Sequence, residues 1–145
     1  MMKNSADVSQ DHGEEQDEEL IHLTLAGLLP AEQTLVVNPL MRTATLFRSD
    51  ADGRAHIVRQ QQFSPNGVRV LVPLLQSYPH YCPYEVLLAS LFPLSLEECR
   101  KQLQEAWETA IRPVRRAVGS IIARLRSFGF TVYSIRGAGY LLKAL

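Results

Sequence analysis

Residues 112–145 read RPVRRAVGSIIARLRSFGFTVYSIRGAGYLLKAL, and they indicate the fold more clearly than any other part of the chain. The stretch contains seven basic residues and no acidic residue. The basic residues are Arg112, Arg115, Arg116, Arg124, Arg126, Arg136 and Lys143. Because a solvated surface normally carries charges of both signs, this run predicts a surface that faces a polyanion.

Residues 112–128 are predicted to form an amphipathic helix. Pro113 suits its first turn, where a backbone N–H has no partner within the helix. Apolar residues recur at helical spacing and predict the buried side: Val114, Val118, Ile122 and Leu125. The opposite side carries small and basic residues: Arg116, Ser120, Ala123, Arg124 and Ser127, with Ile121 and Arg126 nearer the flanks.

A predicted β-hairpin follows this helix directly. Gly129 is typical of a helix end, and Phe130–Ile135 alternates between apolar and polar residues as a strand does. Residues 136–139, RGAG, predict a turn, and residues 140–142 a second strand. A helix followed at once by a basic hairpin is the pattern of a winged helix, in an α+β fold.

Two motifs carry a family resemblance. Residues 116–126, RAVGSIIARLR, and residues 135–141, IRGAGYL, resemble the recognition helix and wing of OmpR/PhoB-type winged helix-turn-helix effector domains. The resemblance covers residues 64–142, and residues 20–63 in pattern only. Gly119 and Ile121 depart from it, since the family often has an acidic and a polar residue there, so base preference is not carried over.

The resemblance implies double-stranded DNA as the ligand, with helix 112–128 in the major groove and Arg136 in the minor groove. Together with the basic pattern it predicts a set of DNA-contacting residues. These are Arg112, Arg115, Arg116, Ser120, Ile121, Ala123, Arg124, Arg126, Ser127, Arg136 and Gly137. DNA is favoured over RNA because the predicted fold offers a helix that can read a groove and lacks an aromatic platform for single strands.

The length of 145 residues allows one compact domain and a tail. Residues 1–20 carry seven acids and one lysine, a net charge of −6, whereas residues 21–145 carry 14 basic and 8 acidic residues, a net charge of +6. Residues 1–19 are therefore predicted to be a disordered acidic tail, and residues 20–145 the winged-helix domain. The family's receiver domain has no room in this chain, which implies a stand-alone effector.

Residues 20–63 predict a small antiparallel sheet. The expected strands are Ile21–Leu25, Thr34–Val37, Thr43–Arg48 and Ala55–Arg59. Residues 49–53, SDADG, form a hairpin signal between the last two strands. So small a sheet must pack on the helices that follow it.

Residues 64–128 predict the helical core, and residues 129–145 the wing. Ser64 and Pro65 are the N-cap and first residue of a helix that is expected to kink or end near Pro73. Residues 78–83 predict a turn, and residues 84–92 a second short helix.

Residues 95–111 predict a further amphipathic helix. Ser95 and Glu98 have the spacing of a capping box. Trp107 either completes the core or lies on an exposed contact surface. The resemblance adds that the corresponding segment, residues 93–111 here, can contact RNA polymerase.

Catalytic and metal chemistry are not indicated. The histidines His12, His22, His56 and His80 are scattered, so no enzyme activity and no cofactor is expected. His80, Cys82 and Cys99 could bind zinc in principle, but structural zinc sites usually take four ligands in closely spaced pairs. Two cysteines without a CxxC pair, no secretory signal and no membrane-length apolar run predict a cytoplasmic protein.

The sequence therefore predicts a bacterial, sequence-specific DNA-binding regulator of transcription, with a homodimer on DNA as one possible arrangement. The alternative is a winged-helix protein-interaction module with little DNA binding.

Overall fold

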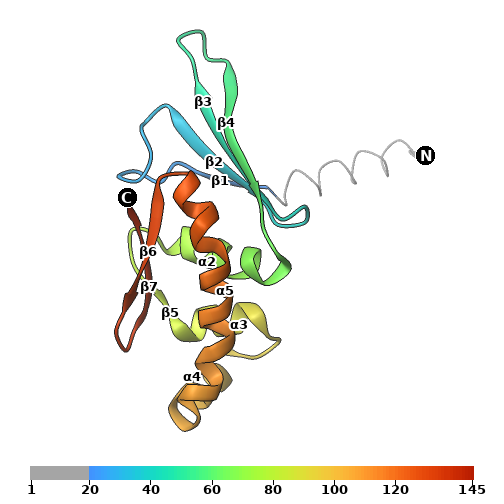
Figure 1. The fold of residues 1–145 in the computed structure, drawn as a ribbon, viewed down its shortest axis with the longest axis vertical. Helices are drawn as coiled ribbons and strands as arrows, with labels where there is room; N and C mark the ends of the chain where they lie inside the picture. Colours follow the sequence, from blue (N-terminus) through green and yellow to red (C-terminus); the bar gives the residue numbers. More distant parts are fainter. Residues whose placement is uncertain (1–19) are drawn as a thin grey trace, which may run out of the picture.

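The computed structural model describes residues 20–145, which form an α+β fold (Figure 1). A four-stranded antiparallel sheet comes first in the chain, and four helices and a C-terminal β-hairpin follow it. The sheet lies at one end and the helix α4 at the other, with the long helix α5 running between them. The predicted acidic tail, residues 1–19, lies outside the described residues.

The sheet has the strand order β1-β2-β3-β4, each pair antiparallel. Its strands are β1 (Ile21–Leu23), β2 (Gln33–Asn38), β3 (Thr43–Ser49) and β4 (Ala55–Gln62). Leu35 pairs with Leu46 and Val37 with Ala44, and these four side chains are buried on one face of the sheet. The predicted sheet is confirmed, although β1 ends before Leu25, whose backbone turns with a φ of 49°.

The first helix of the described chain, α2 (Pro65–Ser77), begins where the sequence predicts. The Ser64 hydroxyl accepts a hydrogen bond from the backbone N–H of Gly67 at 3.0 Å. The expected early end near Pro73 is wrong, because the helix continues to Ser77. Leu71 and Leu74 are fully buried on either side of the proline. The burial of each leucine contributes about 2 kcal/mol, and together they offset the cost of about 3 kcal/mol for a proline inside a helix.

Helix α3 (Tyr84–Leu91) matches its prediction closely, but the segment after it differs. The capping box at α4 (Leu96–Glu105) is confirmed, with hydrogen bonds between Ser95 and Glu98 in both directions. The single helix predicted through Ile111 is wrong. Ala106 has a φ of −144° and a ψ of 57°, which ends α4 and lets α5 (Trp107–Ser127) begin in a new direction.

The C-terminal hairpin consists of β6 (Phe130–Ile135) and β7 (Gly139–Ala144). A short strand, β5 (Cys82–Pro83), pairs with β7, so this sheet has the order β5-β7-β6. The predicted turn over residues 78–83 and the predicted place of Gly139 in the hairpin turn are therefore wrong where β5 pairs with β7, because Pro83 lies opposite Gly139. Within residues 20–145, no helix is long and apolar enough to cross a membrane.

Candidate nucleic-acid interface

Helix α5 provides the largest part of the candidate site. It is 21 residues long, and one side of it is buried against the other helices and strand β6. The buried residues are Ala110, Ile111, Val114, Ala117, Val118, Ile121 and Leu125. The helix ends at Ser127, and Gly129 two residues later has a φ of 92°, which is accessible to glycine; its N–H donates to the Arg126 carbonyl at 2.9 Å.

The predicted start of this helix, at Pro113, is wrong. Pro113 lies inside α5, which already begins at Trp107. Proline is common in the first turn of protein helices but is not confined to it, and here the residues before it pack inward: Ala110 and Ile111 are buried. Trp107 is half-buried and meets the ring of Tyr84 edge-on at 5.2 Å, which supports its predicted role in completing the core.

Ile121 was predicted to contact DNA, and this prediction is wrong. Its side chain is fully buried, whereas Ile122, predicted to be buried, is only half-buried. The predicted buried residues Val114, Val118 and Ile122 are spaced four residues apart, but one helical turn takes only about 3.6 residues. Each step of four therefore rotates further around the helix, and Ile122 lies beyond the buried side. Ile121 stays in phase with Val114 and packs close to Gly67 of α2, where a Cβ atom would lie 3.1 Å from its methyl group.

The other predicted residues of α5 lie at the surface. Arg112, Arg115, Arg116, Ser120, Ala123, Arg124 and Arg126 are exposed, and Ser127 is half-buried. Arg112, Arg116, Ser120 and Arg124 follow one another at intervals of four and therefore form one ridge along the helix. We call this set the α5 ridge.

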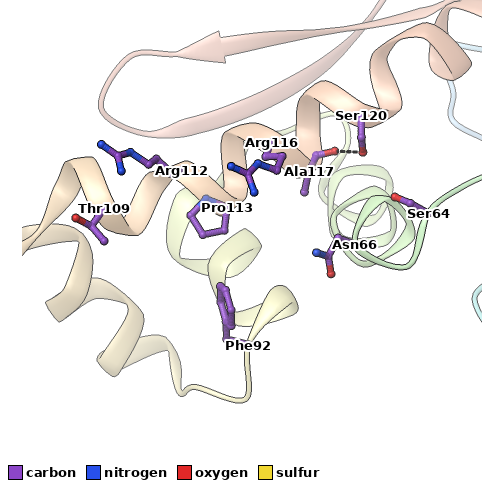
Figure 2. A pocket seen from close by; sticks show the side chains of 9 residues that line it. All are labelled: Ser64, Asn66, Phe92, Thr109, Arg112, Pro113, Arg116, Ala117 and Ser120. Atoms are coloured by element: carbon purple, nitrogen blue, oxygen red, sulfur yellow. Dashed lines mark hydrogen bonds between the residues drawn. The ribbon is translucent and has the colours of Figure 1, made fainter.

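The α5 ridge borders a groove of about 500 Å³ that three helices share (Figure 2). Arg112 and Arg116 line it from α5, Asn66 from the start of α2, and Phe92 from the end of α3. Ser64, Asn66 and Phe92 were not predicted as site residues. Ser64 could be recognised as a helix cap, but nothing local in the sequence shows that α2 and α3 place these residues beside α5.

The hairpin turn brings Arg136 and Gly137 to the surface, as predicted. Gly137 has a φ of 75°, and the Ala138 N–H closes the turn by donating to the Ile135 carbonyl at 2.9 Å. Tyr84 anchors the same turn twice: its backbone N–H donates to the Ala138 carbonyl at 3.1 Å, and its hydroxyl to the Ile135 carbonyl at 3.2 Å. The tip is therefore held against the start of α3.

A charge on α5 also acts on a residue of the C-terminal hairpin. Burial raises the pKa of the Tyr140 hydroxyl on β7, and the positive charge of Arg115 on α5 partly offsets this rise. Arg115 thus lies within electrostatic reach of the hairpin. We call the exposed arginines of α5 and Arg136 together the basic surface, which comprises Arg112, Arg115, Arg116, Arg124, Arg126 and Arg136.

The acids of the described chain lie elsewhere. Five of them belong to α3, α4 and the first turn of α5: Glu85, Glu97, Glu98, Glu105 and Glu108. Within residues 20–145, the ion pairs are His56 with Asp50 at 2.7 Å and Arg100 with Glu85 at 3.1 Å. Neither involves an arginine of the basic surface. Glu108 lies four residues before Arg112 on α5, so it is the described acid closest in sequence to that surface.

The described residues also include potential metal ligands and thiols. In the part of the chain that the structure describes, no three His, Cys, Asp or Glu side chains come together as a metal site would require. Cys82 and Cys99 are buried free thiols, and burial raises the pKa of each, which disfavours the reactive thiolate.

Comparisons of the chain with protein-family models, curated proteins and solved structures found no match. The interpretation of the basic surface therefore depends on its own residues, geometry and charge.

Proposed function

We propose that this protein binds double-stranded DNA through a winged helix-turn-helix domain and regulates transcription. The observation that carries the proposal is the basic surface, six exposed arginines on one helix and the adjoining hairpin turn without a described acidic partner. Arginine in this density, without interspersed acids, is typical of a surface that contacts phosphates.

The arrangement of α3, α5 and the hairpin supports a groove-binding mode. At 1.5 Å per residue, α5 is about 32 Å long, close to one turn of a DNA duplex. Gly119, Ser120 and Ala123 are exposed between the arginines, and their small side chains allow the helix backbone to approach base edges. The hairpin turn, held by Tyr84, would present Arg136 to the neighbouring minor groove.

The groove beside the α5 ridge supports phosphate contacts at the same surface. Arg112 and Arg116 line it together with the amide side chain of Asn66, and both arginines project from α5 at its edge (Figure 2). Guanidinium and amide groups are the usual donors to phosphate oxygens, and such contacts fix the position of a protein on a duplex.

A protein-interaction function is the second candidate, and one observation favours it. An apolar cavity of about 540 Å³ lies where α3, α4 and α5 meet, lined among others by Leu88, Leu94 and Ala110. Phe92 and Leu96 are partly exposed near it. This cavity adjoins residues 93–111, for which we propose contact with a protein of the transcription machinery such as RNA polymerase.

The salt dependence of binding separates the two candidates. If about four to six arginines contact phosphates, log affinity for a random duplex falls with log salt concentration at a slope of about −4 to −5. Fluorescence anisotropy with a labelled duplex measures this slope. The matched control is Lys101→Ala, which removes one exposed charge from α4 and should leave the slope unchanged. A flat dependence, or no binding at low salt, would contradict DNA binding and favour the interaction module.

A further inference from the structure

Strands β3 and β4 extend beyond the helices as a hairpin, on the side of the molecule where α5 ends (Figure 1). Residues 55–60 of β4 are exposed throughout, and so are Arg48 and Ser49 at the end of β3. This part of the sheet therefore contributes little to the core. We call residues 48–60 the projecting hairpin.

The strand register shows which side chains of this hairpin share a face. Arg59 pairs with Leu46 and Gln61 with Ala44, and paired residues of antiparallel strands project from the same face. Leu46 and Ala44 are buried on the face that packs on the helices. Arg59 and Gln61 therefore project from that face too. The register shifts by one residue of β4 after Leu46, but β3 itself continues to alternate, so Arg48, two residues after Leu46 and paired with His56, projects from the same face.

Gln61 connects this face directly to α5. Its side-chain amide donates to the Ser127 hydroxyl at 3.1 Å, and that hydroxyl donates to the Arg124 carbonyl at 2.6 Å. Along the strand, Arg59 is about 7 Å further out than Gln61. The face that carries Arg59 and Arg48 thus continues outward from the end of α5 that carries Arg124 and Arg126.

The acids of the projecting hairpin are in its turn. Asp50 accepts hydrogen bonds from the backbone N–H groups of Asp52 and Arg54, each at 2.9 Å, and pairs with His56. Its carboxylate is therefore engaged within the turn. Among residues 20–145, Arg48 and Arg59 take part in neither ion pair.

We propose that the projecting hairpin is a second DNA contact, in which Arg48 and Arg59 bind backbone phosphates next to the segment that α5 contacts. The inference rests on the proposed function, because a duplex lying along the α5 ridge would pass the end of α5 where Gln61 meets Ser127. The contact of Arg48 and Arg59 with phosphates would be independent of sequence, and it would lengthen the DNA segment that the protein covers beyond that contacted by α5 and Arg136. Charged residues on an edge strand also discourage sheet-to-sheet association, a role that does not require DNA.

The test compares two double variants of the whole chain on a labelled random duplex of about two helical turns. Arg48→Ala/Arg59→Ala should weaken binding about tenfold at low salt and reduce the salt slope by about two. Lys101→Glu changes the charge of α4 by the same two units and leaves the Arg100–Glu85 ion pair in place, so it should change neither the affinity nor the slope. Arg48→Lys/Arg59→Lys, which retains the charges, should keep most of the slope.

The outcomes separate the inference from the proposed function. If the unmodified protein does not bind the duplex, the proposed function fails. If it binds and Arg48→Ala/Arg59→Ala behaves like Lys101→Glu, DNA binding stands and the hairpin contact is overturned. Circular dichroism of each variant establishes that it is folded, and a defect that the lysine variant rescues cannot come from loss of the fold.

Discussion

Gly139 lies where the C-terminal hairpin packs closely on strand β5. A Cβ atom there would overlap the carbonyl oxygen of Cys82 and lie 2.9 Å from the Cα atom of Pro83. These are backbone atoms of β5, so no side-chain rotation could relieve the overlap. The close pairing of β7 with β5 also keeps Ala138 within reach of the Tyr84 N–H, and so holds the turn that carries Arg136.

Gly139→Ala should therefore lower the free energy of unfolding by about 3 kcal/mol, because β5 or β7 must shift. Urea denaturation measures the change. The same substitution at Gly119 is the control, since no atom would lie within 4 Å of the new methyl group. Gly119→Ala should raise stability by about 0.5–1 kcal/mol through its helix propensity. Equal effects at the two positions would contradict the role assigned to Gly139.

Three arginines of the basic surface are predicted to make different kinds of contact with DNA: to a base edge, to phosphates and in the minor groove. Arg124→Ala should cost about 1–3 kcal/mol on a preferred site and relax specificity there, as expected for a contact to a base edge. Arg116 borders the groove shared with Asn66 (Figure 2), and its alanine variant should weaken all sequences about equally. Arg136→Ala should matter most where A·T-rich sequence narrows the minor groove.

Selection of bound sites from random duplexes supplies the preferred sequence for this comparison. Anisotropy on that site, on a version with exchanged flanks and on a random duplex then separates the three roles. Equal losses for all three variants on every duplex would contradict the division.

At the scale of elements, the sequence predicted those features that a few neighbouring residues determine. Ser64 caps α2, Ser95 and Glu98 form the capping box, and Gly53 closes the β3–β4 turn with a φ of 79°. Each depends on hydrogen bonds or backbone angles within about five residues. Most strand assignments of the N-terminal sheet were correct for a similar reason, because alternation is a local pattern.

Features that depend on packing between distant elements were not predictable in this way. The close contact of Ile121 with Gly67 of α2 depends on how the two helices meet, and no pattern within α5 indicates it. The continuation of α2 through Pro73 depends on the leucines that it buries. The groove of the candidate site requires α2 and α3 to meet α5, which no local pattern in their sequences indicates.

The capping box of α4 leads to a prediction about acid. Hydrogen bonds from the Ser95 backbone N–H and its hydroxyl lower the pKa of Glu98 below its ordinary value. Because the folded-state pKa is the lower one, the contribution of Glu98 to stability is present above the unfolded pKa of about 4.3 and is lost as pH falls through the folded value. Ser95→Ala removes the hydroxyl that caps the helix but keeps the backbone N–H that donates to Glu98. It should lower the free energy of unfolding by about 1 kcal/mol and raise the pKa of Glu98 only part of the way toward its ordinary value.

An NMR titration of the glutamate carboxyl groups measures that pKa, and denaturation measures the stability. Glu97→Gln is the matched control, since Glu97 occupies the same first turn without a contact to Ser95 among the described hydrogen bonds. Unchanged stability of Ser95→Ala would contradict the capping role of the hydroxyl, and an unchanged pKa of Glu98 would assign the whole shift to the backbone N–H.

At the scale of the whole molecule, charge is distributed unevenly. Residues 1–20 carry a net charge of −6 and residues 21–145 a net charge of +6. Within the described part, most acids belong to α3, α4 and the start of α5, whereas the C-terminal stretch from Arg112 has none. A duplex approaching the basic surface therefore competes with any acidic segment that is tethered to the same chain.

Residues 1–19 are such a segment by composition, and tethering gives them a high effective concentration near the basic surface. Deleting them should tighten binding to a random duplex several-fold at low salt. The gain should shrink as ionic strength rises, because added salt screens both the tail and the DNA. A full-length variant with the seven acids of residues 7–19 replaced by their amides is the matched control for length, and it should bind as tightly as the truncated chain. If only the truncation tightens binding, the tail acts by occupying space. If neither change alters affinity at low salt, the tail does not compete with DNA.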